Sequence, residues 1–83
     1  MKLSIQIFAT LAHKLGQSEI DVQLDEGATV GDMLKNAASR YPSIAPLLER
    51  SAVAVNLSYV KADHTLRPDD EVALIPPVSG GAP

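Results

Sequence analysis

The side chains of this 83-residue sequence offer few groups that could carry out chemistry. His13 and His64 are far apart, and neither has another donor at the spacing of a known metal site, so both are expected at the surface or in loops. The acidic residues at 69–71 and 25–26 fit turns better than an EF-hand loop or a catalytic carboxylate pair. We therefore predict no metal site and no catalytic side chain.

The sequence contains no cysteine, which excludes disulfides, thiolate zinc sites and cysteine-ligated iron–sulfur clusters. Any sulfur chemistry must therefore proceed without a side-chain thiol. Gly80 and Gly81 are the only adjacent glycines, and no helix-forming segment follows them to receive a phosphate group. The remaining candidate for chemistry is the main chain close to these glycines.

The last eight residues have the composition of an extended arm. Pro76 and Pro77 favour a stiff, extended exit from the preceding strand. Six extended residues from Pro76 to Gly81 would reach about 20 Å. Because glycine has no Cβ, the backbone at Gly80 and Gly81 can pass through a channel too narrow for side chains. The pattern predicts an arm that delivers a main-chain carboxylate to another protein, with a frayed end or added linker as the alternative.

Apolar periodicity predicts the strands that must hold this arm. Residues 2–7 and 19–24 alternate between polar and apolar types, as strands with one buried face do. Residues 52–55 are a short apolar strand, residues 71–75 are expected to form the final strand, and residues 59–60 are expected to begin an edge strand. The arm should therefore follow directly on the last strand.

One main helix is predicted from residue 30 to about residue 41. Thr29 is a good N-cap, Asp32 makes a weaker version of the capping box, and Pro42 stops the helix. Its apolar residues recur on one face: Val30, Met33, Leu34, Ala37 and Tyr41. Shorter helical turns are expected before Gly16 and around Pro46.

This order of elements predicts an α+β fold in which one helix covers one face of a single sheet. A first hairpin, one main helix and late strands are what a β-grasp fold needs, with a mixed sheet of four to five strands. A ferredoxin-like sandwich would require a second full helix. We expect the domain at residues 1–75 and a flexible C-terminal arm at residues 76–83.

Charge and hydropathy limit the possible partners. The net charge is −3 and the seven Lys and Arg residues are scattered, so no nucleic acid is expected as a ligand. Ser4 and Gln6 interrupt the apolar stretch near the N-terminus, which favours a strand over a secretory leader. No apolar run is long enough to span a bilayer, and we expect a soluble, cytoplasmic protein without a membrane partner.

Residues 70–81 (Asp-Glu-Val-Ala-Leu-Ile-Pro-Pro-Val-Ser-Gly-Gly) resemble the ubiquitin-like sulfur carrier family, specifically the small subunit of molybdopterin synthase. Weaker similarity runs over nearly the whole chain to Gly81, with local matches at residues 8–9, 24–30, 54–56 and 60. The resemblance implies a ubiquitin-like β-grasp fold. It also implies that an ATP-using activating enzyme adenylates the Gly81 carboxylate, which then becomes a thiocarboxylate. Its sulfur would pass to cyclic pyranopterin monophosphate in molybdenum cofactor biosynthesis.

The same resemblance implies a carrier that binds no cofactor itself and is not an enzyme on its own. Its partners would be the activating enzyme and the large, catalytic subunit of the synthase, in a heterotetramer. The arm residues that thread into the partner would be Pro76, Pro77, Val78, Ser79 and Gly80. By resemblance, Phe8, Tyr59 and Ile75 would contact the partner, with a core position as the alternative for Phe8 and Ile75.

The sequence departs from the family pattern after the second glycine. Ala82 and Pro83 leave the Gly81 carbonyl in an amide, which ATP cannot adenylate. We expect a protease to trim these two residues, with residues added during cloning or a non-functional paralogue as alternatives. Two other functions stay open: a sulfur carrier for thiamine or cysteine biosynthesis, and a ubiquitin-like conjugation module.

Overall fold

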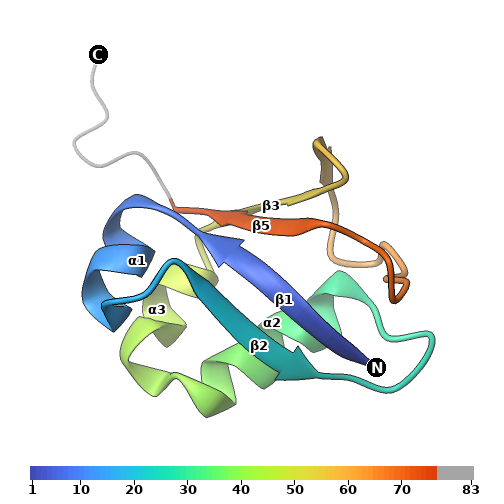
Figure 1. The fold of residues 1–83 in the computed structure, drawn as a ribbon, viewed down its shortest axis with the longest axis horizontal. Coiled ribbons are helices and arrows are strands. Elements are labelled where there is room, and N and C mark those ends of the chain that lie inside the picture. The colour runs from blue at the N-terminus through green and yellow to red at the C-terminus, as the bar shows by residue number, and fades with distance from the viewer. Residues whose placement is uncertain (77–83) are drawn as a thin grey trace.

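The computed structural model describes residues 1–76, in which a five-stranded mixed sheet carries helices on one face (Figure 1). Strands β1 (Lys2–Ile7) and β2 (Glu19–Gln23) pair antiparallel. Buried and exposed residues alternate along both strands, so each turns one row of side chains to the core and one to solvent. The predicted first hairpin is confirmed, with helix α1 (Ala9–Leu15) inserted between its strands.

The last described strand lies in the middle of the sheet. The strand order is β2-β1-β5-β3-β4, in which β5 (Val72–Ile75) runs parallel to β1 and antiparallel to β3 (Ala52–Val55). Strand β4 (Ser58–Val60) pairs with β3 and forms the edge. This arrangement confirms the predicted mixed sheet and β-grasp fold.

Helix α2 (Val30–Arg40) crosses the inner face of the sheet and starts at the predicted capping box. The Asp32 amide donates to Thr29 Oγ1 at 3.2 Å, and the Thr29 amide donates to Asp32 Oδ2 at 3.0 Å. Hydrogen bonding by the Thr29 amide, and after it by the Thr29 side chain, lowers the pKa of the Asp32 carboxyl. The predicted apolar face packs on the strands: Val30, Met33 and Ala37 are buried, and Leu34 and Tyr41 pack at the margin of the core.

Two shorter helical segments follow the main helix. A 3₁₀ helix (Pro42–Ile44) leads into α3 (Ala45–Leu48), in agreement with the helical turn predicted around Pro46. Helix α1 has seven residues and ends at Gly16, whose φ of 67° is the left-handed conformation that favours glycine at a helix end. The sequence predicted the position of α1 correctly, but it predicted only a short helical turn where the structure has a helix.

The connection before β5 closes the amino end of α2. The Val30 amide donates to the His64 carbonyl at 2.9 Å, and the Gly31 amide donates to the Ala62 carbonyl at 2.9 Å. Two helix N–H groups that lack intrahelical partners are satisfied in this way. Leu66 is buried and fixes the connection to the core.

The core beneath the sheet is entirely apolar among the described residues, and no polar or charged residue of residues 1–76 is buried in it. Ile5, Leu11, Met33, Ile44 and Leu74 are inaccessible to solvent. Within the same range, no helix has the length and apolar character needed to cross a membrane.

Candidate functional site

The arm leaves from the centre of the sheet, at the end of β5. The neighbouring strands hold β5 on both sides there: Leu74 pairs with Ile7 of β1, and Ile75 pairs with Ala52 of β3. Strand β5 ends at Ile75, as its following prolines predicted. Figure 1 shows this end of β5 close to the start of α1. A well-supported strand therefore fixes the point from which the arm departs.

Pro76, predicted as the first residue of the arm, is buried. The predicted reach is therefore counted from residue 77, and five residues up to Gly81 would span at most about 17 Å if fully extended. The other predicted arm residues lie outside the described residues: Pro77, Val78, Ser79, Gly80, Gly81, Ala82 and Pro83.

The face of the sheet opposite α2, here called the open face, is divided into two halves. Its polar half consists of the outward side chains of β1 and β2. Lys2 Nζ lies 3.8 Å from Asp21 Oδ2, and Ser4 Oγ donates to Glu19 Oε1 at 3.2 Å. These pairs are solvated and give the polar half the character of ordinary protein surface.

The apolar half consists of the outward side chains of β5, β3 and β4. Cross-strand pairing places Ala73 opposite Ala54, and Ala54 opposite Tyr59. Ala52 is on the same side of β3 as Ala54, since successive side chains alternate between the faces. These three alanines form a low surface between taller side chains, here called the alanine floor (Ala52, Ala54 and Ala73).

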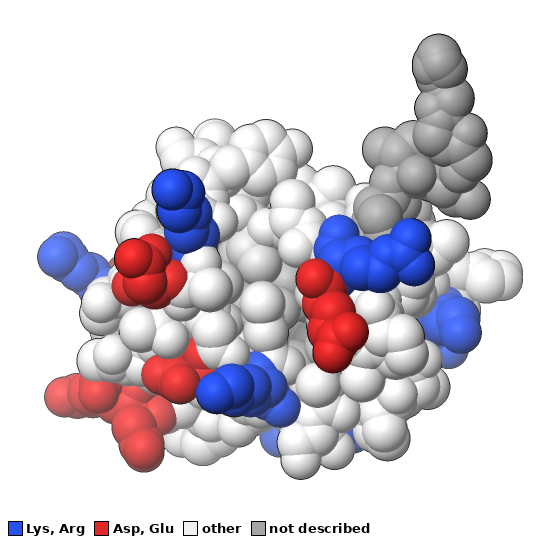
Figure 2. Space-filling view, turned by 180° about the vertical axis from the view of Figure 1, so that it is seen from behind, with Lys and Arg blue, Asp and Glu red and all other residues white. Residues whose placement is uncertain are grey.

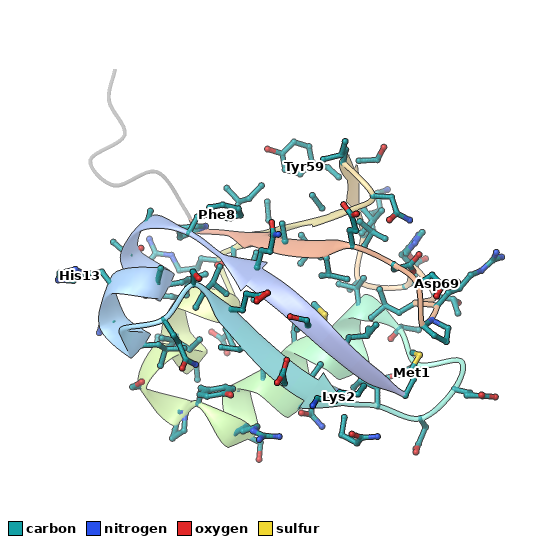
Figure 3. All side chains as sticks on the ribbon, viewed as in Figure 1. Met1, Lys2, Phe8, His13, Tyr59 and Asp69 are labelled. Carbon is teal, nitrogen blue, oxygen red and sulfur yellow. The ribbon has the colours of Figure 1, made fainter. Side chains whose placement is uncertain are left out.

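The three residues predicted to contact a partner all border the alanine floor. Phe8 is the N-cap of α1 and 46% exposed, and Ile75 is half-buried beside Ala52 on the next strand. Tyr59 is 72% exposed on the edge strand. In Figure 3, Phe8 lies near the end of β5 and Tyr59 lies beyond β3. The exposure of Phe8 rules out the fully buried core position considered for it, and a contact role for the three residues remains a prediction.

Sequence reasoning missed Leu57, the most exposed large apolar residue described, at 95%. It occupies the second position of the two-residue turn between β3 and β4, with φ of 70°, after Asn56 with φ of 51°. Hairpin turns of this kind favour Asn-Gly, because glycine adopts a left-handed φ without strain. For a residue with a Cβ, this conformation costs roughly 1–2 kcal/mol. The leucine in the glycine position of an Asn-Gly turn was the signal that could have identified it.

A hydrogen-bonded clamp holds this turn against β5. The Asn56 side chain donates to Asp70 Oδ1 at 3.0 Å and accepts from the Glu71 amide at 2.9 Å. The Arg67 amide donates to Asp70 Oδ2 at 2.8 Å. The acidic residues at 69–71 therefore form a turn, as predicted.

The sequence predicted no metal site at its two histidines or at its two acidic runs. His13 lies at the outer end of α1 (Figure 3), and His64 lies in the connection that closes α2. Within residues 1–76, no three His, Asp or Glu side chains come close enough to hold a metal ion. On the face of the described residues shown in Figure 2, Lys and Arg are interspersed with Asp and Glu and form no continuous basic stripe.

Comparison with known proteins identifies relatives over nearly the whole chain. Residues 5–81 match the ThiS family, a range that includes both glycines of the arm and stops before Ala82. The chain is 37% identical to the molybdopterin synthase sulfur carrier subunit of Dictyostelium discoideum, with 96% of each chain covered. It is 32% identical to small archaeal modifier protein 3 of Haloferax volcanii, over 98% of this chain and 100% of that protein.

Solved structures agree with these sequence matches. The crystal structure of SAMP1 from Haloferax volcanii superposes with a TM-score of 0.84 at 29% identity, covering 98% of this chain and all of that one. Its similarity supports the ubiquitin-like form of the β-grasp fold predicted above. A central strand that ends at the arm, a single main helix and a family match that extends through Gly81 lead to one assignment: the chain belongs to the ThiS family.

Proposed function

We propose that this chain is the sulfur carrier subunit of molybdopterin synthase, and that it carries sulfur as a thiocarboxylate on Gly81. The observation that carries the proposal is the 37% identity, over 96% of both chains, to the Dictyostelium discoideum carrier subunit. The acceptor of the sulfur would be cyclic pyranopterin monophosphate. The chain acts as a non-catalytic subunit, and we place its work in the cytoplasm.

The chemistry follows from the need to activate a carboxylate. The Gly81 carboxylate attacks the α-phosphorus of ATP on the activating enzyme, which releases pyrophosphate and forms an acyl adenylate. A sulfur nucleophile then displaces AMP and leaves the thiocarboxylate. This route needs no cysteine on the carrier, and the sequence has none. The catalytic acids, bases and cations belong to the two partner proteins.

Docking must offset the order imposed on the arm. Fixing five backbone residues costs about 5–10 kcal/mol of conformational entropy, at roughly 1–2 kcal/mol per residue. Two glycines offer little contact area in return, so a contact between the folded bodies must contribute. The apolar half of the open face supports this role because it borders the exit of the arm. Its partner is the large subunit of the synthase, within a heterotetramer.

Trimming of the last two residues is part of the proposal. Gly81 is joined to Ala82 by a peptide bond, so its carboxylate becomes available only after cleavage. The end of the family match at Gly81 supports this cleavage point. A protease would supply the step before activation.

The test is reconstitution with purified partners. A form ending at Gly81, incubated with the activating enzyme, ATP and a sulfur donor, should gain the mass of one oxygen-to-sulfur exchange at its C-terminus. The loaded form should then convert the pterin precursor on the large subunit. Gly81→Lys should abolish both steps and leave the Tm unchanged, since the core described in residues 1–76 is complete without it. Sulfur found elsewhere on the loaded chain would refute the proposal.

A second candidate is a protein modifier joined through Gly81 to lysines of other proteins. The 32% identity to small archaeal modifier protein 3 favours it. Isopeptide adducts in cells, lost in a form truncated before Gly81, would support this function. A sulfur carrier for thiamine or cysteine biosynthesis shares the arm, and capture of the large synthase subunit would distinguish the molybdopterin pathway.

A further inference from the structure

The turn between β3 and β4 contains a strained residue, and packing within the domain does not offset the cost of that strain. Leu57 has a φ of 70° at a position where glycine would be unstrained. Its side chain is 95% exposed, so it gains almost nothing from packing within the described residues. Strained residues persist where the surrounding structure fixes them, and they concentrate at functional sites. The benefit of this leucine must therefore come from outside the domain.

The clamp under the turn fixes where Leu57 points. Asn56 bonds to Asp70 and Glu71, which directly precede β5, and β5 leads into the arm. The turn and the root of the arm are thus parts of one rigid frame. Rigid presentation lowers the entropy lost on binding, which is how a single exposed side chain becomes an effective contact.

We propose that Leu57 is a docking residue that inserts into an apolar recess on the protein that accepts the arm. This inference rests on the proposed function and names a contact that function did not include. Leu57 and Tyr59 then form one edge of the contact surface, and Phe8 and Ile75 form the other. The alanine floor between them allows the partner to approach closely.

The size of an ordinary interface supports this occupant. A contact of about 800 Å² on each partner corresponds to a disc of roughly 16 Å radius. Strands lie about 5 Å apart and rise about 3.3 Å per residue, so a disc centred on Ala54 reaches both Ile75 and Leu57. An interface of ordinary size that is centred on the alanine floor would therefore cover both the exit of the arm and the turn.

A second copy of this chain is a poorer occupant of the same surface. Beside Leu57 lies a small, shallow hollow, lined by Gln6, Ala54, Leu57, Glu71, Val72 and Ala73. Polar Gln6 and charged Glu71 line this hollow, so it is a poor receptor for the leucine of a second copy placed face to face. We therefore assign the apolar recess to the protein that takes the arm, and a second copy of this chain is an outcome that the experiment distinguishes.

The experiment measures stability and affinity on the same variants. Leu57→Gly and Leu57→Asn relieve the left-handed strain, so each should raise the Tm, by about 4–8 °C for the glycine variant. Each should also weaken binding of the Gly81-terminated protein to the large subunit of molybdopterin synthase by about tenfold in calorimetry. Leu57→Met, which keeps an apolar side chain, should retain most of the affinity. Substitution of a residue with a merely structural role would not raise the Tm and weaken binding at the same time.

The possible failures are distinguishable. Unchanged affinity of Leu57→Asn, with normal binding by the wild type, would overturn this inference alone. Concentration-dependent dimerisation that Leu57→Asn abolishes would overturn it in favour of a second copy. A wild-type protein that does not bind the large subunit would refute the proposed function, and the docking role would fall with it.

Discussion

The two halves of the open face are built on one sheet, yet they differ as surfaces. The polar half presents solvated pairs such as Lys2 with Asp21. The apolar half presents alanines bordered by exposed Phe8, Leu57 and Tyr59. The buried side chains beneath both halves are uniformly apolar, because folding requires only that face to exclude water. Folding therefore leaves the residue types of the open face free to serve function, and only the half next to the arm is apolar.

The contrast also explains how a small domain tolerates exposed apolar side chains. Alanine side chains add little apolar area, so the alanine floor keeps the exposed apolar area of the patch small. The large side chains are limited to its borders, where a partner would cover them. A polar half on the same sheet keeps the rest of the surface hydrated.

A charge placed in the apolar half should break this contrast most strongly. Ala54→Lys would bury an unpaired ammonium under the partner, at a cost of about 3–5 kcal/mol, and weaken binding by more than about a hundredfold. Calorimetric titration with the large subunit measures the change. The matched control is Ser4→Lys in the polar half, which should bind as the wild type does. Equal losses in both variants would show that the halves do not differ in function.

Removing the exposed ring of Tyr59 should have the next largest effect. Tyr59→Ala should lower affinity by about 2 kcal/mol, or roughly thirtyfold, because aromatic side chains at the edge of a low surface are typical binding hot spots. Stability should change little, since the side chain is 72% exposed. Urea unfolding and binding measured together test this, and a large loss of stability would assign Tyr59 to the fold.

The helix-covered face should respond in stability and not in binding. The Thr29 hydrogen bonds lower the folded-state pKa of Asp32, so its contribution is present above the unfolded pKa and is lost as pH falls through the folded pKa. Asp32→Asn should therefore be less stable than the wild type at pH 7, with the difference disappearing in acid. Unfolding curves at several pH values check this. Reduced affinity of Asp32→Asn at neutral pH would contradict the separation of the two faces.

The polar half should give the smallest effect. Lys2→Ala removes an exposed ion pair whose contribution is expected below about 1 kcal/mol. The Tm should fall slightly, by less at high salt, and affinity for the large subunit should stay the same. A marked loss of binding would extend the contact surface into the polar half.

Local patterns in the sequence determined most of the elements. Alternation predicted β1 and β2, and the 3.6-residue period predicted the buried face of α2, because both depend only on which side chains must leave water. The Thr29 capping box and the Gly16 end of α1 were predictable because they involve residues only a few positions apart. The diglycine arm was predicted in the same way, from a run of adjacent residues, and it stays a prediction because it lies outside the described residues.

Only the tertiary structure decided what these elements present to a partner. The central place of β5 follows from pairing with β1 and β3, which are distant in sequence, and no local pattern encodes that order. Phe8 and Leu57 are apolar residues that sequence alone would place equally well in a core. Their exposure follows from how long-range pairing positions the start of α1 and the β3–β4 turn. Burial depends on what the rest of the chain brings against a side chain, so the surface around the arm had to be seen in three dimensions.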